Sequence, residues 1–305
     1  MSIVTVIIPV LNAMPYLPGA LASLEAQTFK DFEVCLWDNG SIDGSAEEAR
    51  RWIPGRLGGR VVCGNPLPLH ECLARMVVEA KTEFVARMDG DDVCFPDRLQ
   101  RQMEIMGKHA DMSAVGGQMD LMDGRGDKIG EMPEYPIDFC GVLSRMLFQC
   151  PLPHPAVLLR WEKVLAAGNY QVPKPMEDFD LWFRLAGVGE MRNLPEKVLK
   201  YRISDSSITN QAKSEGTHSE AVRGCLRENL ESRYGISPSV FDLLWAKRHL
   251  VAFLPMLRAA RRISDLSGVD LRRVLARPEF LFSARCYTGK CDVLSKFVYR
   301  FWGRN

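Results

Sequence analysis

Several absences in the sequence narrow the class of protein at the outset. No run of about 18 apolar residues occurs, so no segment is predicted to span a membrane. The start, MSIVTVIIPVLN, has neither a basic leader nor a small-residue cleavage site, so we expect no signal peptide. The nine cysteines are scattered and include no CxxC pair, which is typical of reduced thiols rather than of disulfides or a zinc site. We therefore expect a cytoplasmic protein.

Common nucleotide-binding motifs are also missing. Neither GxGxxG nor GxxxxGK[ST] occurs, so the dinucleotide-binding and Walker-type classes are disfavoured.

The net charge is only +1, yet residues 241–305 contain 13 Lys and Arg against 5 Asp and Glu. This asymmetry favours an anionic partner for the C-terminal region. We expect no nucleic acid as that partner, because no recognisable nucleic-acid-binding motif accompanies the basic residues.

The first hundred residues alternate short apolar runs with helix-compatible segments, which predicts βαβ units around a mainly parallel sheet. The predicted strands are IVTVIIPV (ended by Pro9), FEVCLWD, RVVCG and EFVARMD, and the predicted helices cover residues 16–27, 45–52 and 69–80. Later segments predict helices in PDRLQRQMEIM, over 138–147 and in MEDFDLWFRLAG, strands in MSAVGGQMDLM and EKVLKYRI, and only helices beyond about 214. Ligands gather at the carboxyl ends of parallel strands, and Asn12, Asp38 and Asp89 each fall at such an end.

Three carboxylates crowd into the stretch FVARMDGDD. Asp89, Asp91 and Asp92 would repel one another unless a cation or hydrogen-bond donors offset the repulsion. We expect Asp91 to bind Mg²⁺ or Mn²⁺, which prefer one or two carboxylates together with phosphate oxygens. Asp89 would instead accept hydrogen bonds from ribose hydroxyls. The alternative is a solvated acidic loop.

The stretch MEDFDLW begins a helix with carboxylates. Asp178 is the predicted general base, with Glu177 orienting it or binding the acceptor. The alternative is a pair of capping carboxylates on a helix that packs in the core.

Four other residues have both a functional and a structural interpretation. In WDNGSIDGS, Asp38 would accept a hydrogen bond from a nucleobase N–H, or both Asp38 and Asp43 would simply cap the turn. The structural interpretation is favoured for Asp43. His154 is interpreted as a structural loop histidine. Arg202 is either a surface arginine or a group that stabilises a diphosphate leaving group.

An ordered series of motifs resembles the family 2 glycosyltransferases, which have the GT-A fold. The series is VTVIIPVLN, EVCLWDNGSIDGS, EFVARMDGDDVCFPDRLQRQ, HPAVLLR, EDFDLWFRLA and LPEKVLKYR, and it spans roughly residues 3–209. The resemblance implies an α/β protein with a GT-A (Rossmann-like) mixed sheet flanked by helices and a helical C-terminal extension. Residues 1–210 would form the catalytic domain, with a nucleotide-binding half (1–98) and an acceptor-binding half (99–210). Residues 211–305 would be helical and associate with a membrane or a partner.

The resemblance also implies an activity. The enzyme would be a hexosyltransferase-type glycosyltransferase of the EC 2.4 class, which moves a sugar from a nucleotide donor, most often UDP, to an acceptor hydroxyl with inversion. Carried over by position, the donor site would contain Pro9 and Asn12 in the first loop, Asp38 at the uracil, Asp89 at the ribose or metal, Asp91 at the metal, and Asp178 as the base. The chain departs from the family pattern at Asn39, Ala74 and Ser204, where a second Asp, an Asn and a His are common.

The C-terminal residues DVLSKFVYRFWGRN suggest where the acceptor lies. On a helix, apolar residues would share one side and Lys296, Arg300 and Arg304 would follow at intervals of four. This composition is typical of a helix at an anionic membrane surface, and packing on the catalytic domain or on a partner is the alternative. We therefore expect a glycan or lipid-linked acceptor in polysaccharide or surface-glycan synthesis, and a peripheral location on the inner face of the cytoplasmic membrane.

Two other functions remain open on this scaffold. A sugar nucleotidyltransferase would need a basic phosphate-binding loop near the first strand, which PVLNAMPYLPG does not supply. A non-catalytic nucleotide- or glycan-binding protein would bind nucleotide without turnover.

Overall fold

The computed structural model describes residues 2–146, 149–171, 176–203 and 217–234, together with 261 and 265. The chain divides into two units, one of Met1–Tyr135 with Leu152–Gln211 and the other of Pro136–Pro151 with Ala212–Asn305. Ser204, the predicted interfacial helix and most of the predicted helical C-terminal region lie outside the described residues.

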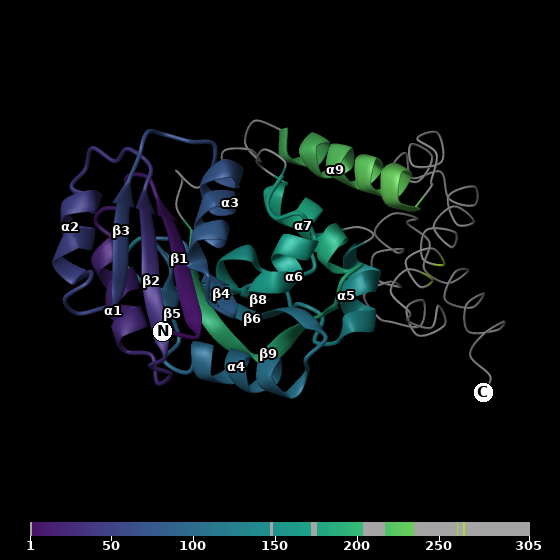
Figure 1. The fold of residues 1–305 in the computed structure, drawn as a ribbon, viewed down its shortest axis with the longest axis horizontal. Coiled ribbons are helices and arrows are strands. Elements are labelled where there is room, and N and C mark those ends of the chain that lie inside the picture. The colour runs from purple at the N-terminus through teal and green to yellow at the C-terminus, as the bar shows by residue number, and fades with distance from the viewer. Residues whose placement is uncertain are drawn as a thin grey trace. The chain divides into compact units, whose positions relative to one another are not determined.

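In the first unit, nine strands of the described residues form one mixed sheet, in the order β3-β2-β1-β4-β8-β6-β9-β5 with β7 beside β6. Its parallel part comprises β1 (Val4–Val10), β2 (Phe32–Asp38), β3 (Gly59–Cys63) and β4 (Phe84–Arg87). The connecting helices are α1 (Leu17–Glu25), α2 (Ser45–Trp52) and α3 (Leu69–Ala80). Figure 1 shows α1 and α2 on one side of these strands and α3 on the other. The predicted βαβ organisation is confirmed.

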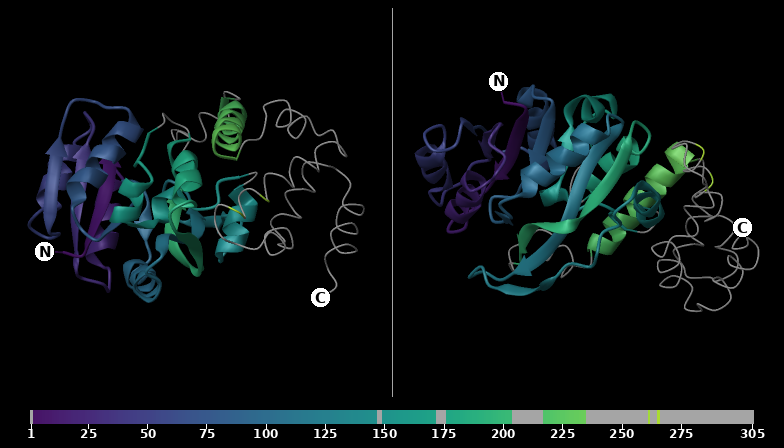
Figure 2. Two further views of the ribbon diagram at one scale, coloured as in Figure 1. Left: turned by 45° about the vertical axis from the view of Figure 1, so that its right-hand side comes forward. Right: turned by 90° about the horizontal axis from the view of Figure 1, so that it is seen from below.

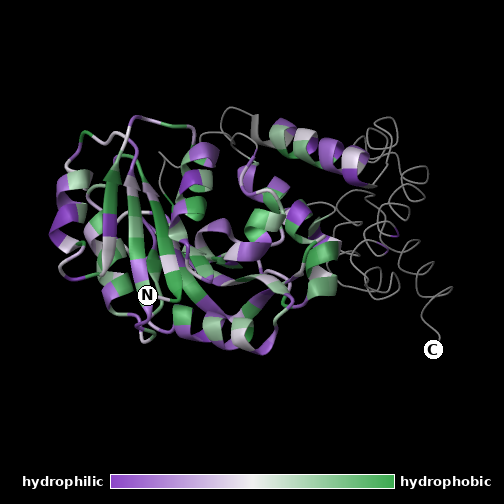
Figure 3. Cartoon of the chain, viewed as in Figure 1, coloured by the Kyte–Doolittle hydropathy of each residue, from purple (hydrophilic) through white to green (hydrophobic). Residues whose placement is uncertain are grey.

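Apolar residues explain why these strands are central. β1 and β2 are buried along most of their length, and Figure 3 shows them as hydrophobic beside a largely hydrophilic α2. Such continuous apolar runs are typical of parallel strands with helices on both faces. Ile8 and Leu36 share one core cluster with Leu21 of α1 and Trp52 of α2.

The prediction that Pro9 ends the first strand is wrong. β1 continues to Val10, and Pro9 pairs in register with Trp37 of β2. The N–H groups of the odd-numbered residues of β1 face β4, as the bond from Met88 N–H to the Ile7 carbonyl indicates. Because the β1–β4 ladder stops at Ile7, no partner strand needs the N–H that proline lacks.

The second half of the sheet is mostly antiparallel to its neighbours. It contains β5 (Val93–Cys94), β6 (Met112–Met122), β7 (Lys128–Glu131), β8 (Leu158–Arg160) and β9 (Glu190–Arg202). The long strands β6 and β9 run parallel and side by side (Figure 2). The helices of this part are α4 (Arg98–Lys108), the 3-10 turn η1 (His154–Ala156), α6 (Trp161–Ala166) and α7 (Glu177–Leu185).

The second unit contains two described helices, α5 (Phe139–Met146) and α9 (Thr217–Tyr234). α9 confirms the predicted helical character for the part of the C-terminal region that the structure describes. Within the described residues, no helix combines the length and apolar character needed to cross a membrane.

Candidate functional site

The strand order reverses between β1 and β4, since β2 and β3 lie beyond β1 while β8 lies beyond β4. Ligands bind outside the carboxyl ends of strands at such a switch point. Asn12 and Asp89 lie in the segments that follow β1 and β4, and Asp38 is the last residue of β2. The fold therefore brings these three strand ends to one edge of the sheet, as the sequence predicts.

Asn12 fastens the segment after β1 to the turn after β2. Its side-chain oxygen accepts from the Ile42 N–H at 2.9 Å, and its own N–H donates to Ser41 Oγ at 2.9 Å. Asn12 has a left-handed backbone (φ 53°), which asparagine tolerates better than most residues. The predicted contact of Asn12 and Pro9 with the donor stays a prediction, and the observed role of the Asn12 side chain is to position this loop.

Asp43 fastens the same two segments at a second point. Its carboxylate accepts from the Met14 N–H at 2.8 Å and from both the N–H and the hydroxyl of Ser45, at 3.0 and 2.6 Å. Burial opposes ionisation, but these bonds outweigh it and hold the pKa of Asp43 below its ordinary value. The structural interpretation of Asp43 agrees with these contacts.

Asp38 and Trp37 end β2 with buried polar atoms. Asp38 is 4% exposed, and its Oδ2 accepts a long 3.3 Å bond from the Ser41 N–H. In the part of the chain that the structure describes, Asp38 Oδ1 and Trp37 Nε1 are buried without a hydrogen-bond partner. Buried polar atoms without a partner are costly, so a ligand that donates to Asp38 would relieve that cost.

Asn39 determines the path of the segment before α3. Its amide nitrogen donates to the Leu67 carbonyl and its amide oxygen accepts from the Leu67 N–H, both at 2.8 Å. This two-way contact needs both a donor and an acceptor on one side chain, and aspartate would offer only acceptors.

The acidic cluster lies directly after β4. One carboxylate oxygen from each of Asp89, Asp91 and Asp92 lies within 4.8 Å of the others. Burial, followed by the charge of Asp89, raises the pKa of Asp91 to about 6. Burial and the charges of Asp89 and Asp91 raise the pKa of Asp92 well above its ordinary value. Three hard oxygen donors at this spacing fit a divalent cation such as Mg²⁺ or Mn²⁺.

Gly90 allows this cluster to approach the end of β1. A Cβ at Gly90 would lie 3.2 Å from both the Ala13 Cβ and a Val10 methyl group. The glycine between Asp89 and Asp91 therefore lets the acidic loop pack against the loop that Asn12 fastens.

Arg87 is a functional candidate that our sequence interpretation missed. The last residue of β4, it is 4% exposed and holds Asp89 through two contacts, Nη1 to Oδ2 at 2.7 Å and Nη2 to Oδ1 at 2.5 Å. Burial alone lowers the pKa of Arg87, but the charge of Asp89 and then those of Tyr170, Asp92 and Glu177 outweigh it and leave the pKa raised. The sequence did carry a signal for Arg87, because a charged residue there ends an apolar strand two positions before an aspartate.

Arg202 joins the acidic loop to β9. Its N–H donates to Asp92 Oδ1 at 2.9 Å, and its guanidinium donates to the carbonyls of Asp91 (2.8 Å) and Asp123 (2.6 Å). The guanidinium also lies 4.2 Å from the centre of the Tyr16 ring. Arg202 is buried, so it is not the surface arginine that the sequence left open. Its predicted contact with the donor stays a prediction.

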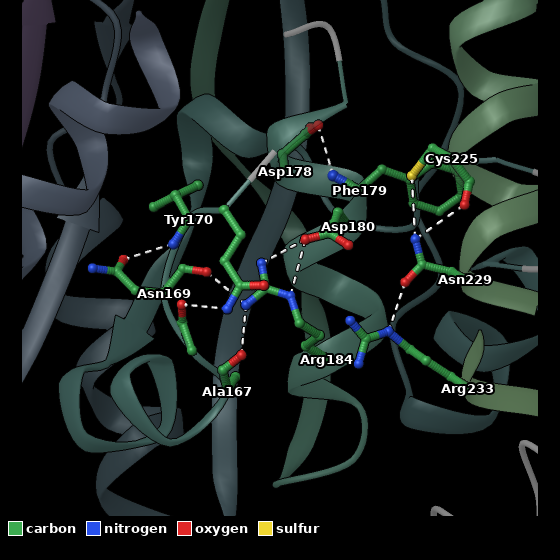
Figure 4. Close-up of polar contacts among 12 residues, drawn as sticks. Ala167, Asn169, Tyr170, Asp178, Phe179, Asp180, Arg184, Cys225, Asn229 and Arg233 are labelled. Carbon is green, nitrogen blue, oxygen red and sulfur yellow. Dashed lines mark hydrogen bonds and ion pairs between the residues drawn. The ribbon is translucent and has the colours of Figure 1, made fainter. Parts of the chain in front are cut away.

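Helix α7 carries the predicted base. Within its first turn, Asp178 is partly exposed, whereas Glu177 and Asp180 are buried. Asp180 pairs with Arg184 one turn later, and Asp178 Oδ1 accepts from the Phe179 N–H at 2.7 Å (Figure 4). Asp178 is thus the carboxylate of this turn with the greatest access to a substrate.

His154 of η1 lies between Tyr170 and Trp182 of α7. His154 Nε2 and the Tyr170 hydroxyl share a 2.8 Å hydrogen bond, and the His154 ring meets the Trp182 ring of α7 edge-on. Burial and then the charge of Arg87 hold the pKa of His154 well below 6.5, so the imidazole is neutral. Burial raises the pKa of Tyr170, Arg87 opposes this, and Asp178 and Glu177 add to it. The structural interpretation of His154 agrees with its burial.

Comparison with known proteins finds similarity to glycosyltransferases. The model of Glycosyl transferase family 2 matches residues 5–146. A relative, the amylovoran biosynthesis glycosyltransferase AmsE of Erwinia amylovora, is 29% identical over 197 residues, which cover 64% of this chain and 73% of AmsE. The predicted resemblance to the family 2 glycosyltransferases is thus confirmed over residues 5–146. The chain is therefore a glycosyltransferase, as the motif series predicts.

Solved structures of glycosyltransferases share its fold. TarS residues 1–349 of S. aureus, in complex with UDP-GlcNAc, is 16% identical, with a TM-score of 0.59 over 95% of this chain and 91% of that one. The mannosyltransferase PcManGT of Pyrobaculum calidifontis, in complex with GDP-Man and Mn²⁺, is 18% identical, with a TM-score of 0.55 over 99% and 88%. The chain has the predicted GT-A fold.

Proposed function

We propose that this glycosyltransferase transfers a sugar, with inversion, from a nucleotide donor to a hydroxyl of a glycan or lipid-linked acceptor in surface-polysaccharide synthesis. UDP is the proposed nucleotide. The observation that carries the proposal is the cluster of Asp89, Asp91 and Asp92 at the strand switch point, within the residues that the family 2 model matches. The name of the AmsE relative and the nucleotide sugars bound to the TarS and PcManGT neighbours support it.

The donor base would bind at the end of β2. Asp38 would accept from the base N–H through Oδ1, the buried oxygen that has no partner in the described structure. Pro9 and Asn12 would border the same donor site from the first loop, whose position Asn12 and Asp43 maintain. Asp38 would face the base and not the diphosphate, because its negative charge attracts a base N–H and repels a phosphate.

The diphosphate would be held at the acidic cluster, with Mn²⁺ or Mg²⁺ as the cofactor. Asp91 would be the main protein ligand of the cation, and Asp89 would share it or accept from the ribose hydroxyls. When bound, the cation supplies positive charge that offsets the negative charge growing on the leaving diphosphate. Arg202 would hold the Asp91 backbone carbonyl and the Asp92 carboxylate in place and add a positive charge beside the leaving group.

The acceptor would be activated by α7. Asp178 would take the proton from the acceptor oxygen as that oxygen attacks the anomeric carbon, and Glu177 would orient Asp178 or bind the acceptor. Asp180 is committed to Arg184 and is a poor candidate for the base. A single displacement on the face opposite the leaving group gives inversion through an oxocarbenium-like transition state.

The three ranges of the chain would have different roles. Residues 1–98 would bind the donor, 99–210 the acceptor, and the basic region 211–305 would bring the enzyme to an anionic membrane surface or to a partner. Deletion of residues 285–305 should abolish sedimentation with vesicles of anionic lipid. Unchanged sedimentation would refute the membrane part of this proposal.

The direct test is donor cleavage by the purified full chain. UDP-, GDP- and dTDP-sugars are supplied in turn with Mn²⁺ or EDTA, and both nucleotide release and nucleotide binding are measured. We expect Mn²⁺-dependent release from one donor, loss of release in Asp91→Asn, and normal release in Asp111→Asn, a matched change at an exposed aspartate. Failure to bind any of these nucleotides in Mn²⁺ would overturn the proposal.

A further inference from the structure

Arg87 and Asp89 form a two-point ion pair within the acidic cluster. Both terminal nitrogens of Arg87 contact Asp89, one on each carboxylate oxygen. The third nitrogen, Nε, is buried without a partner in the described structure. This fork geometry is the strongest arrangement that arginine and a carboxylate form.

The backbone of Arg87 is held as firmly as its side chain. Its N–H donates to the Val157 carbonyl at 3.0 Å, and its carbonyl accepts from Nη2 of Arg98 at 2.7 Å. Arg98 is itself 1% exposed and also donates to the Val157 carbonyl at 3.3 Å. The guanidinium of Arg87 therefore has little freedom to leave Asp89.

The three carboxylates of the cluster differ in the ion pairs and hydrogen bonds that offset their negative charge. Asp89 has a cationic partner on both oxygens, although its side chain is still 30% exposed. Within the described residues, the Asp91 carboxylate has no ion pair, because Arg202 contacts only the Asp91 backbone carbonyl. Asp92 is fully buried, with Oδ1 accepting from the Arg202 backbone N–H.

We propose that Arg87 is a positioning residue that fixes and neutralises Asp89, so that a divalent cation binds mainly through Asp91 and weakly until the donor diphosphate arrives. This inference rests on the proposed function. Ionised, the three carboxylates and Arg87 together carry a charge of −2, and without Arg87 they would carry −3. Cation affinity at carboxylate sites rises with the number of charged ligands, so Arg87 keeps the affinity for free metal low. The remaining lone pairs of Asp89 stay in a fixed position for the donor.

The test is Mn²⁺ binding by the full chain without nucleotide, measured by titration calorimetry and by the Mn²⁺ electron paramagnetic resonance signal. We expect Arg87→Met to bind Mn²⁺ about tenfold more tightly than the wild type, because one positive charge is lost beside the ligands. The KM for the donor should rise in the same variant, because Asp89 is no longer held. If Arg87 had a purely structural role, its substitution would not tighten Mn²⁺ binding.

Two further variants keep the test decisive if Arg87→Met fails to fold. Arg87→Lys keeps the charge but loses the fork, so Mn²⁺ affinity should stay within about twofold of the wild type while the donor KM rises. Arg87→Met with Asp89→Asn removes both charges, and its Mn²⁺ affinity should also stay near the wild-type value. A loss of Mn²⁺ binding in this double variant would make Asp89 the main ligand and overturn the inference.

The outcomes also distinguish this inference from the proposed function. If Asp91→Asn binds Mn²⁺ as well as the wild type, the proposed metal site itself is wrong. If Asp91→Asn loses Mn²⁺ but Arg87→Met binds it no more tightly than the wild type, the metal site stands and the role of Arg87 is refuted. Arg51→Met, a change at a side chain that is 77% exposed, is the control for general effects of charge.

Discussion

Asp180 and Arg184 form an ion pair along the buried side of α7, with Nη2 and Nε of Arg184 at 2.6 and 2.9 Å from one oxygen of Asp180. Their side chains are 8% and 4% exposed. Arg184 also donates to the carbonyls of Ala167 and Asn169, which follow α6 (Figure 4). The pair therefore anchors the helix that carries Asp178 to the segment that carries Tyr170.

We expect Arg184→Met to destabilise the protein by about 3–5 kcal/mol, because it removes the arginine charge from beside the buried Asp180 carboxylate. Urea unfolding followed by circular dichroism measures the change. Arg51→Met removes the ion pair that the 77% exposed Arg51 makes with Glu48 and should leave the unfolding midpoint nearly unchanged. Equal midpoints for the Arg184→Met variant and the wild type would refute the anchoring role.

The sequence predicted this helix and most of the regular structure, because apolar periodicity depends on local residues. The bounds of α2, α3 and β6 agree with the prediction to the residue. The prediction from sequence missed β5 and β7, which have two and four residues. β5 pairs with the distant β9, and β7 pairs with β6. Short runs carry too little periodicity to predict such pairings.

Asn39→Asp restores the residue that is common in the family, yet we expect it to weaken this protein. Aspartate cannot donate to the Leu67 carbonyl, so one bond is lost and two acceptors face each other. The expected cost is about 1 kcal/mol in unfolding free energy, with faster protease cleavage in residues 64–68. A variant as stable and as resistant to cleavage as the wild type would show that this contact does not determine the loop.

His154 should make stability depend on pH. Its pKa is well below 6.5 in the folded protein and near 6.5 in the unfolded chain, so the unfolded state binds more protons below pH 6.5. The stabilisation from neutral His154 is complete above pH 6.5 and is lost as the pH falls. Between pH 7.5 and 5.5 this loss is about 1 kcal/mol.

The check compares urea unfolding of the wild type and of His154→Asn at these two pH values. The variant should lose less stability on acidification than the wild type, by about the same 1 kcal/mol, because asparagine does not titrate. Equal losses in the two proteins would mean that His154 is not held neutral by the fold.

The candidate site was only partly predictable. The residues at strand ends, Asp38, Asp89 and Asp91, follow from the βα pattern because the topology brings those ends together. The partners that hold them do not follow from it. Arg202 lies more than 100 residues from Asp91 and Asp92 along the chain, and no local pattern relates them. The Arg87–Asp89 pair was accessible from sequence, since a buried arginine needs a nearby counter-ion.

The most direct measurement of the central claim separates donor binding from catalysis in Asp178→Asn. The full chain and the variant are compared for nucleotide-sugar dissociation constants in Mn²⁺ and for the rate of nucleotide release from the donor that the wild type binds most tightly. If Asp178 is the general base, the dissociation constant should stay within about twofold while release falls by about 10²–10⁴. Release at the wild-type rate would contradict the role of Asp178, and binding without release in both proteins would contradict the transferase mechanism itself.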